Sequence, residues 1–282
     1  MNIVIGYVFI LLATALSSSS SYVLSEKKDK CRIVQKTTLT CVESTPEDFP
    51  SVKNDKIEWL LISKSNIPSI TKNLLKHYPS LTDLHAEKNE IEKIDENAFS
   101  ATKNLDWVDV SFNKITTVSP KIFSNCPNIQ YFNISGNPNL VIPENEPFIE
   151  SPSLQWLLLQ QSNIKMVYEE TFKGVPGLKV LSLSDNQLKT LPENVFNNLN
   201  NLYSLDLSKN QFTTLPVSLF EPLQYISLYL SDNPWECDCK LYPTIQWSKN
   251  RRLRDEVRCS KPDNKKWQEK INMKCDMEIS VY

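Results

Sequence analysis

The sequence predicts an α/β fold in which a short coil of chain repeats about eight times and stacks into a curved solenoid, with a parallel β-sheet on its concave face. Three observations predict this architecture. A pattern of aliphatic residues and asparagine recurs at spacings of 23 to 25 residues after residue 56. A phenylalanine recurs in the same phase, and two groups of cysteines flank the periodic region. We therefore expect a stack of coils with a disulfide-bonded cap at each end.

The composition excludes several function classes. The chain of 282 residues carries 31 basic and 33 acidic side chains, and this near-neutral balance argues against a nucleic-acid binder. Its 4 glycines are too few for a phosphate-binding loop, and its 2 histidines leave little for a histidine-based metal site or catalytic triad. We therefore expect no cofactor, no metal ion and no nucleic-acid partner.

Residues 1–25 are predicted to be a signal peptide. Residues 3–16 form an apolar run without charge, and small residues follow through Ser21, so cleavage is expected between about residue 15 and residue 25. The alternative is an uncleaved membrane anchor, but the run is shorter than the ~20 residues that span a bilayer. No second apolar run follows. The sequence therefore predicts a soluble protein, secreted to the extracellular space without membrane insertion, where disulfides can form.

Residues 26–56 are expected to form the N-terminal cap. This short polar segment contains Cys31 and Cys41, which we expect to bond to each other. A cap is needed because the first coil of a solenoid has an apolar side that no preceding coil covers.

Residues 57–233 contain the repeats, and each follows the template LxxLxLxxNxL. The second and third leucines flank an outward residue, as in a short strand, and each strand is expected to lie in parallel beside the next. The asparagine follows where the strand ends, and its amide can donate to and accept from open backbone groups. Ser65 and Ser162 replace it in two copies and should make a poorer ladder. The copies begin at Ile57, Leu81, Leu105, Ile129, Leu154, Leu178, Leu202 and Tyr225.

The far side of each coil is expected to be apolar too, because the recurring phenylalanine packs there. Cys126, the only cysteine between the caps, lies three residues after Phe123, where other coils carry hydrophobic residues. It is either a small buried hydrophobe or a thiol that links two chains, and its phase in the repeat favours the first interpretation. The phenylalanines are Phe99, Phe123, Phe148, Phe172, Phe196 and Phe220, with Leu75 ahead of them.

Residues 234–282 are expected to form the C-terminal cap. Cys237 and Cys239 are one residue apart and are not expected to bond to each other, which leaves two ways to pair them with Cys259 and Cys275. A metal site is the alternative explanation for clustered cysteines, but no histidine lies nearby and the compartment is expected to be oxidising. The sequence therefore favours two disulfides here.

The repeats and both caps resemble those of the extracellular leucine-rich repeat family, over roughly 225 residues. The resemblance implies a horseshoe-shaped leucine-rich repeat solenoid and the pairings Cys237–Cys259 and Cys239–Cys275. The N-terminal cap departs from the family pattern, because it carries two cysteines where many members have four. What is known of the family implies recognition in innate immunity, development or cell adhesion.

The outward strand positions carry the candidate binding residues. Alternation places the third and fifth residues of each copy on the concave face. Exposed tryptophan and tyrosine are favoured at binding hot spots, although aromatic residues also suit strands and stack across sheets. The acids beside them, which include Glu87 and Asp106, would prefer a partner with basic groups. The candidates are Trp59, Leu61, Asp83, His85, Trp107, Asp109, Tyr131, Trp156 and Leu158.

The acceptor sequence Asn133-Ile134-Ser135 makes Asn133 a candidate glycosylation site. Asn133 is the fifth residue of its copy, so a glycan there would cover the middle of the candidate binding surface. Three interpretations stay open at this point. The acceptor is unused, the glycan borders the contact, or binding occurs elsewhere, such as on the C-terminal cap.

The sequence therefore predicts a secreted, non-enzymatic module that binds an extracellular protein ligand or receptor, or a microbial surface or matrix component, through its concave face. His85 lies near Asp83 and Asp109, but no serine or cysteine nucleophile with a suitable base is identifiable. Such a module is expected to be a monomer until its ligand binds. The alternative is a structural or adhesive extracellular-matrix protein that self-associates, for which homodimers are expected.

Overall fold

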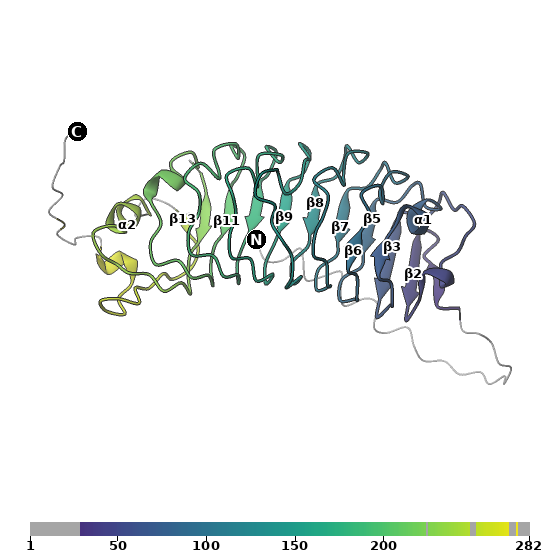
Figure 1. The fold of residues 1–282 in the computed structure, drawn as a ribbon, viewed down its shortest axis with the longest axis horizontal. Helices are drawn as coiled ribbons and strands as arrows, with labels where there is room; N and C mark the ends of the chain where they lie inside the picture. The colour runs from purple at the N-terminus through teal and green to yellow at the C-terminus, as the bar shows by residue number, and fades with distance from the viewer. Residues whose placement is uncertain (1–28, 224, 249–251, 271–274, 276–282) are drawn as a thin grey trace.

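The computed structural model describes residues 29–223, 225–248, 252–270 and 275. The predicted signal peptide, residues 1–25, lies outside these residues. The coils lie side by side along the long axis of the molecule, and their strands run across that axis (Figure 1).

The described strands form one long sheet of 11 strands and a small sheet of 2 strands. The long sheet begins with an antiparallel pair, β1 (Cys31–Val34) and β2 (Thr38–Val42), and every later pair in it is parallel. Each predicted copy contributes one strand, which confirms the predicted solenoid. The remaining strands are β3 (Trp59–Ser63), β5 (Asp83–His85), β7 (Trp107–Asp109), β8 (Tyr131–Asn133), β9 (Trp156–Leu158), β10 (Val180–Ser182), β11 (Ser204–Asp206), β12 (Ser227–Tyr229) and β13 (Arg252–Leu253).

Short elements lie between these strands. The small sheet pairs β4 (Ser69–Ile70) with β6 (Lys93–Ile94), also in parallel. Helix α1 (Lys72–Leu75) begins after Thr71, whose hydroxyl accepts a hydrogen bond from the backbone of Leu74 and so caps the helix. The other helices are α2 (Tyr242–Ser248) and the 3₁₀ helices η1 (Pro46–Asp48), η2 (Val217–Phe220) and η3 (Trp267–Lys270).

The core lies between the sheet and the far side of the coils. The central residue of each repeat strand, from Leu60 in β3 to Leu228 in β12, is fully buried. All the predicted phenylalanines are buried too, which confirms that they pack from the far side. One position differs: Tyr225 is 87% exposed, and its neighbour Ile226 is buried in its place. Isoleucine suits this buried position better than tyrosine, because burying tyrosine would leave its hydroxyl group without a hydrogen-bond partner.

A ladder of asparagine side chains joins successive coils, as the sequence predicts. Asn113 is typical: its Nδ2 donates to the carbonyl of Val110 in its own coil and to that of Ala86 in the preceding coil, both at 2.9 Å. Its Oδ1 accepts from the backbone N–H of Ile91 in the preceding coil at 3.0 Å. Each asparagine therefore satisfies backbone groups of two coils at once. The other members are Asn89, Asn137, Asn186, Asn210 and Asn233.

The two serines in the ladder make fewer hydrogen bonds than the asparagines, which confirms the poorer ladder that the sequence predicts at these positions. Ser162 Oγ donates to the carbonyl of Gln160 at 2.9 Å and accepts a long bond of 3.4 Å from the N–H of Asn137 in the preceding coil. Ser65 Oγ donates to the carbonyl of Ser63. A hydroxyl carries one proton where an amide carries two, so neither serine reaches a carbonyl of the preceding coil.

The residue before each ladder position adopts a left-handed backbone conformation. The φ angles lie between 50° at Lys64 and 68° at Gly136, and Gly136 is the one glycine among them. A non-glycine residue in this region costs about 1–3 kcal/mol. The neighbouring ladder bonds offset this cost in every coil, although no glycine pattern in the sequence marks the turn.

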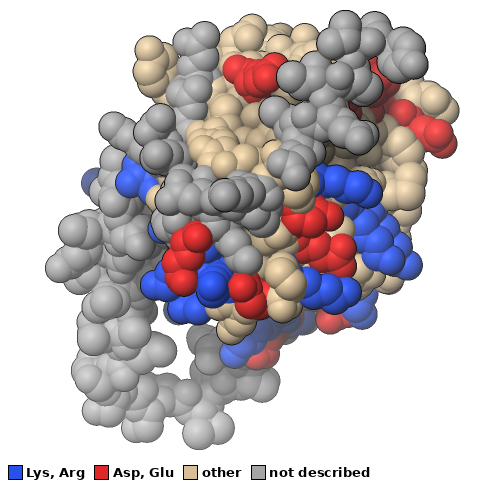
Figure 2. Space-filling view, turned by 90° about the vertical axis from the view of Figure 1, so that its left-hand side faces the viewer, with Lys and Arg blue, Asp and Glu red and all other residues tan. Residues whose placement is uncertain are grey.

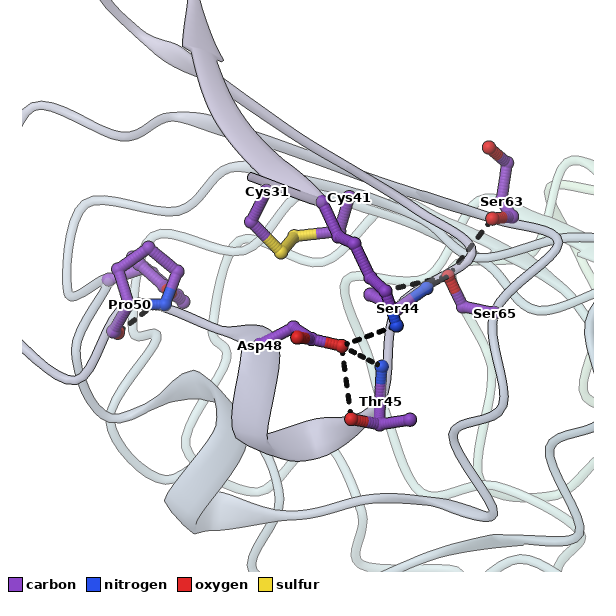
Figure 3. Close-up of a disulfide and its surroundings, with 10 residues drawn as sticks. Cys31, Cys41, Ser44, Thr45, Asp48, Pro50, Ser63 and Ser65 are labelled. Atoms are coloured by element: carbon purple, nitrogen blue, oxygen red, sulfur yellow. Dashed lines mark hydrogen bonds and ion pairs between the residues drawn. A yellow bond between two sulfur atoms is a disulfide. The ribbon is translucent and has the colours of Figure 1, made fainter. Parts of the chain in front are cut away.

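The N-terminal cap is built as an additional partial coil. Strand β2 lies in register with β3, and Ser44 occupies the place of a ladder residue, with its Oγ 2.8 Å from Ser65 Oγ. The predicted disulfide joins Cys31 to Cys41 across β1 and β2 (Figure 3). The cap therefore covers the first coil with the same backbone geometry that joins one coil to the next.

The C-terminal cap contains both disulfides that the family resemblance implies, Cys237–Cys259 and Cys239–Cys275. Trp235 and Trp267 are buried against each other, with ring centroids 5.2 Å apart. Cys126 is the unpaired cysteine and is buried between the coils. The structure therefore supports its assignment as a core residue.

Candidate binding site on the sheet

The nine candidate binding residues lie in five neighbouring strands, β3 to β9, on the side of the sheet that faces away from the core. We call this side the sheet face. Strand register aligns one column that runs from Trp59 to Trp156 and a second that runs from Leu61 to Leu158. The structure therefore brings all nine residues onto one surface, and their role in binding stays a prediction.

Four rings on this surface form a continuous ring stack. Trp59 stacks on His85 with centroids 5.6 Å apart, and His85 stacks on Trp107 at 6.3 Å. Trp107 stacks on Tyr131 at 3.4 Å, with the two ring planes only 7° apart. Trp156 follows Tyr131 in register but makes no ring contact with it among the described residues. The sequence predicts that His85 lies on the surface, but it does not reveal that the His85 ring stacks between the rings of Trp59 and Trp107.

Three carboxylates lie beside the ring stack near the starts of the strands. They belong to Glu58, Asp83 and Asp106, which the repeat places one or two residues into successive copies. Burial raises the pKa of Asp83 and the charges of Asp106 and Glu58 raise it further, against lowering contributions from the Thr82 hydroxyl and His85. The Thr82 hydroxyl donates to Asp83 at 2.6 Å. The raised pKa of Asp83 thus reflects mainly its burial, with a smaller contribution from the neighbouring acids.

Two more carboxylates, Asp109 and Glu87, lie beside Tyr131 at the other side of the ring stack. Burial raises the pKa of the Tyr131 hydroxyl, and the charges of Asp109 and Glu87 raise it further. Asp109 is held by the hydroxyl of Ser111 at 2.6 Å and by Nδ2 of Asn133 at 3.0 Å. The ring stack therefore runs between two groups of acids.

The charge of these acids is not neutralised within the described chain. None of the five carboxylates forms an ion pair with a described residue. Four buried polar atoms on the same surface also have no hydrogen-bond partner in the described residues, and such atoms are rare in folded proteins. They are Nε2 of His85, Oε2 of Glu87, Oδ1 of Asp106 and Nε1 of Trp107.

The C-terminal half of the sheet face is different, because its polar groups satisfy one another. Gln160 Nε2 donates to the hydroxyl of Ser182 at 2.7 Å, and that hydroxyl lies 3.5 Å from Asp206. Asp206 also accepts from the hydroxyl of Ser208 at 2.6 Å. The outward columns of this half carry one carboxylate, Asp206, which also lacks an ion-pair partner among the described residues, whereas those of the first five coils carry two, Asp83 and Asp109.

The C-terminal cap was an alternative binding location, and its charged groups also pair with one another. Lys261 lies 3.1 Å from Glu236, and Glu256 forms ion pairs with both Lys266 and Arg258. Figure 2 shows this end of the molecule, where basic and acidic side chains lie intermixed. The first five coils therefore form the stronger candidate for a binding surface.

The side chain of Asn133 is engaged on the sheet face. Its Nδ2, the atom that a glycan would modify, donates to Asp109, and its Oδ1 accepts from the backbone N–H of Ser135 at 3.1 Å. Asn133 is half-buried and is the last residue of β8. Glycosylation of this residue stays a prediction.

No cluster of three or more His, Cys, Asp or Glu side chains in the described part of the chain is arranged to hold a metal ion. Within those same residues, no helix has the length and apolar character needed to cross a bilayer.

Comparison with known proteins agrees with this architecture. A family described as "Leucine rich repeat" matches residues 79–138 and 152–212. Comparison with curated protein sequences finds no match. Among solved structures, the chain is similar to human 5T4 (Wnt-activated inhibitory factor 1, trophoblast glycoprotein), with a TM-score of 0.67 and 19% sequence identity over 85% of this chain and 94% of that one. The fold is one that typically serves non-catalytic binding. The chain is a leucine-rich repeat protein with disulfide-bonded caps at its N- and C-terminal ends.

Proposed function

We propose that this chain is a secreted, non-enzymatic module that recognises an extracellular protein ligand through the sheet face of its first five coils. The predicted signal peptide and the three disulfides support an extracellular location, because disulfides persist in oxidising compartments. The repeat fold supports protein binding, since stacked coils present an extended surface.

The observation that carries the proposal is the ring stack flanked by two groups of acids that lack ion-pair partners. Aromatic side chains supply rigid contact area at low entropic cost, and tryptophan and tyrosine are enriched at binding hot spots. Carboxylates without a cation steer and orient a partner that carries basic groups. The partner is therefore a protein with a basic contact surface.

The surroundings of His85 argue against a catalytic role. Its ring lies between the indole rings of Trp59 and Trp107, and its Nε2 has no hydrogen bond to a serine, threonine or cysteine in the described chain. A histidine that acts as a general base must reach the proton it removes. His85 therefore serves the ring stack rather than a reaction.

The proposal is tested by capturing the partner from the protein's own extracellular fluid with the mature wild-type chain and with a triple variant. Replacement of Trp59, Trp107 and Trp156 by serine should abolish capture. Tyr203→Ser combined with Tyr225→Ser removes two exposed aromatic residues from the C-terminal coils and should leave capture unchanged. Capture of the same partner by the tryptophan variant would show that the proposed surface is wrong.

A second variant separates loss of binding from loss of folding. Glu58→Gln with Asp106→Asn removes two charges and leaves every ring in place. It should keep the wild-type melting temperature or exceed it, and it should capture less partner, with the deficit greatest at low salt, where exposed charges are least screened. Undiminished capture at low salt would contradict the role of the acids.

A further inference from the structure

Strand β1 forms an edge of the long sheet, and half of its backbone groups point away from the sheet. The strand order begins with β1, which pairs only with β2. The backbone N–H of Val42 donates to the carbonyl of Lys30 at 2.9 Å, so these two residues are a hydrogen-bonded pair of the antiparallel ladder. Such pairs alternate, so Arg32 also faces β2, whereas Cys31 and Ile33 turn their N–H and C=O groups outward. Among the described residues, no strand takes up these outward groups.

An apolar pocket adjoins this edge on the core side of the sheet. Ile33 is the register partner of the buried Leu39, so its side chain points to the same side as that of Leu39. Both residues line a pocket of about 240 Å³ together with Val52, Ile57 and Tyr78. Ile33 is 52% exposed and Val52 is 76% exposed. The cap therefore leaves apolar surface open beside a free row of backbone groups.

An extended segment of chain that pairs with β1 would satisfy both features. Its backbone would exchange two hydrogen bonds with Ile33, since both outward groups of Ile33 are available to an antiparallel neighbour. The side chain opposite Ile33 would point to the core side and cover the pocket, while the next side chains would alternate onto the sheet face beside Arg32 and Val34. Addition of a strand to an exposed sheet edge is a general mode of peptide recognition.

The charges of the edge decide which kind of segment fits. From Lys30 to Thr37 the chain carries three basic residues and no acidic residue. Lys30 lies 3.1 Å from Asp48, but Arg32 and Lys36 are exposed and form no ion pair with a described residue. A second copy of this chain would bring like charges together, and basic residues at sheet edges oppose such self-pairing. An acidic segment is complementary to the edge instead.

We propose that β1 is a docking edge for an extended, acidic segment of another protein, which adds to the long sheet as an antiparallel strand. The residue opposite Ile33 is apolar, and acidic residues lie beside Arg32 and Lys36. This site goes beyond the proposed function, because it belongs to the N-terminal cap and uses backbone hydrogen bonds instead of the ring stack. It stands whether or not the sheet face of the first five coils binds a ligand.

The proposal is tested by titrating the mature ¹⁵N-labelled protein with three peptides. Ac-Glu-Thr-Val-Ile-Glu-Thr-NH₂ can place its isoleucine opposite Ile33 and its two glutamates beside Arg32 and Lys36. Ac-Lys-Thr-Val-Ile-Lys-Thr-NH₂ has the opposite charges. Ac-Glu-Thr-Val-Pro-Glu-Thr-NH₂ keeps the acids but lacks the N–H that would donate to the carbonyl of Ile33.

The glutamate peptide should shift the backbone amide signals of Cys31 and Ile33 saturably. The lysine peptide should bind at least about fivefold more weakly, because like charges across strands are destabilising. The proline peptide should give no saturable shift. At saturation with the glutamate peptide, hydrogen exchange of the Ile33 amide should slow, whereas exchange of the Arg32 amide, which already faces β2, should stay unchanged.

Variants test each part of the site. Ile33→Pro removes the outward N–H and leaves the hydrogen bonds between β1 and β2 in place, so it should abolish binding of the glutamate peptide at a melting temperature close to that of the wild type. Ile33→Val keeps the N–H and is the matched control, which should still bind. Arg32→Glu changes only an exposed side chain and should make the lysine peptide the better ligand.

Equal binding of the glutamate and lysine peptides, saturable binding of the proline peptide, or an unchanged preference in Arg32→Glu would each overturn the proposal. Sedimentation velocity of the protein alone tests for a second copy at the edge, and we expect a monomer. A dimer that Ile33→Pro converts to a monomer would assign the edge to self-association and overturn the proposal. Slow exchange of the Ile33 amide in the protein alone would overturn it too, because the chain itself would then cover the edge.

Discussion

Asp83 shows at the scale of one residue how the candidate binding surface opposes folding. Burial and two neighbouring acids raise its pKa, so the folded chain holds this proton more tightly than the unfolded chain does. A carboxyl of this kind makes stability fall as the pH rises through its titration range. Above that range the full penalty is present.

We therefore predict that Asp83→Asn raises the melting temperature at pH 7. The amide has no charge to desolvate, and its oxygen can still accept from the Thr82 hydroxyl. The gain should shrink as the pH is lowered towards 3, because native Asp83 then becomes neutral as well. Asp206→Asn is the matched control. It should lower the melting temperature at pH 7, because the two hydrogen bonds that Ser208 donates to its Oδ1 become weaker when the acceptor is a neutral amide. A lower melting temperature for Asp83→Asn at pH 7 would contradict the destabilising effect assigned to this carboxylate.

At the scale of the repeating element, the ladder decides how firmly each coil is joined to the one before it. An asparagine satisfies backbone groups in two coils, whereas a serine lacks the second amide proton. A single substitution at a ladder position can therefore weaken or strengthen the joint between two coils.

We predict that Asn113→Ala lowers the free energy of unfolding by about 2–3 kcal/mol, because buried backbone groups lose their partners. Ser162→Asn should raise it by about 0.5–1.5 kcal/mol, the net contribution of an added hydrogen bond. Urea unfolding measures both changes. Asn139→Ala, at an exposed asparagine outside the ladder, should stay within about 0.5 kcal/mol of the wild type. A neutral Asn113→Ala would show that the ladder contributes nothing to stability.

The elements also show what the sequence can and cannot reveal. Alternation and a 24-residue period are enough to assign the strands, the core and the two outward columns, since inward and outward positions follow from period two. The repeat template does not detect strand β2, because Cys41 and Ser44 occupy the positions where leucine and asparagine are expected. The left-handed turn could not be predicted from glycine positions, because seven of the eight repeat residues that adopt it are not glycine.

The candidate site was predicted less completely than the fold. The columns place Trp59 and Trp107 correctly, but ring stacking depends on side-chain rotation, which the period does not encode. Glu58 was missed, although it precedes Trp59 as Asp106 precedes Trp107 and could have been found by that comparison.

At the scale of the whole molecule, the caps close the two ends of the stack. A solenoid gains its stability from contacts between neighbours, so an uncovered first coil would expose its apolar side. The disulfide Cys31–Cys41 holds β1 against β2, and β2 in turn covers β3.

We predict that replacing both Cys31 and Cys41 by serine destabilises the protein by about 2–4 kcal/mol, because the unfolded chain is no longer cross-linked. Hydrogen exchange should show the earliest loss of protection in β2 and β3, at the uncovered end. Cys126→Ala is the control that removes a thiol without breaking a bridge. Equal stability of the double variant and the wild type would mean that the cap does not depend on its disulfide.

The two serines of the ladder lie at different kinds of joint. Ser65 joins the N-terminal cap to the first coil, where five pairs of residues in β2 and β3 are also in register. Ser162 joins the fourth coil to the fifth, and its hydroxyl makes a single long hydrogen bond to the preceding coil. The ring stack from Trp59 to Tyr131 lies wholly before that joint, while Trp156 lies beyond it. A partner that contacts both the ring stack and Trp156 therefore spans the joint at which the ladder makes the fewest hydrogen bonds between coils.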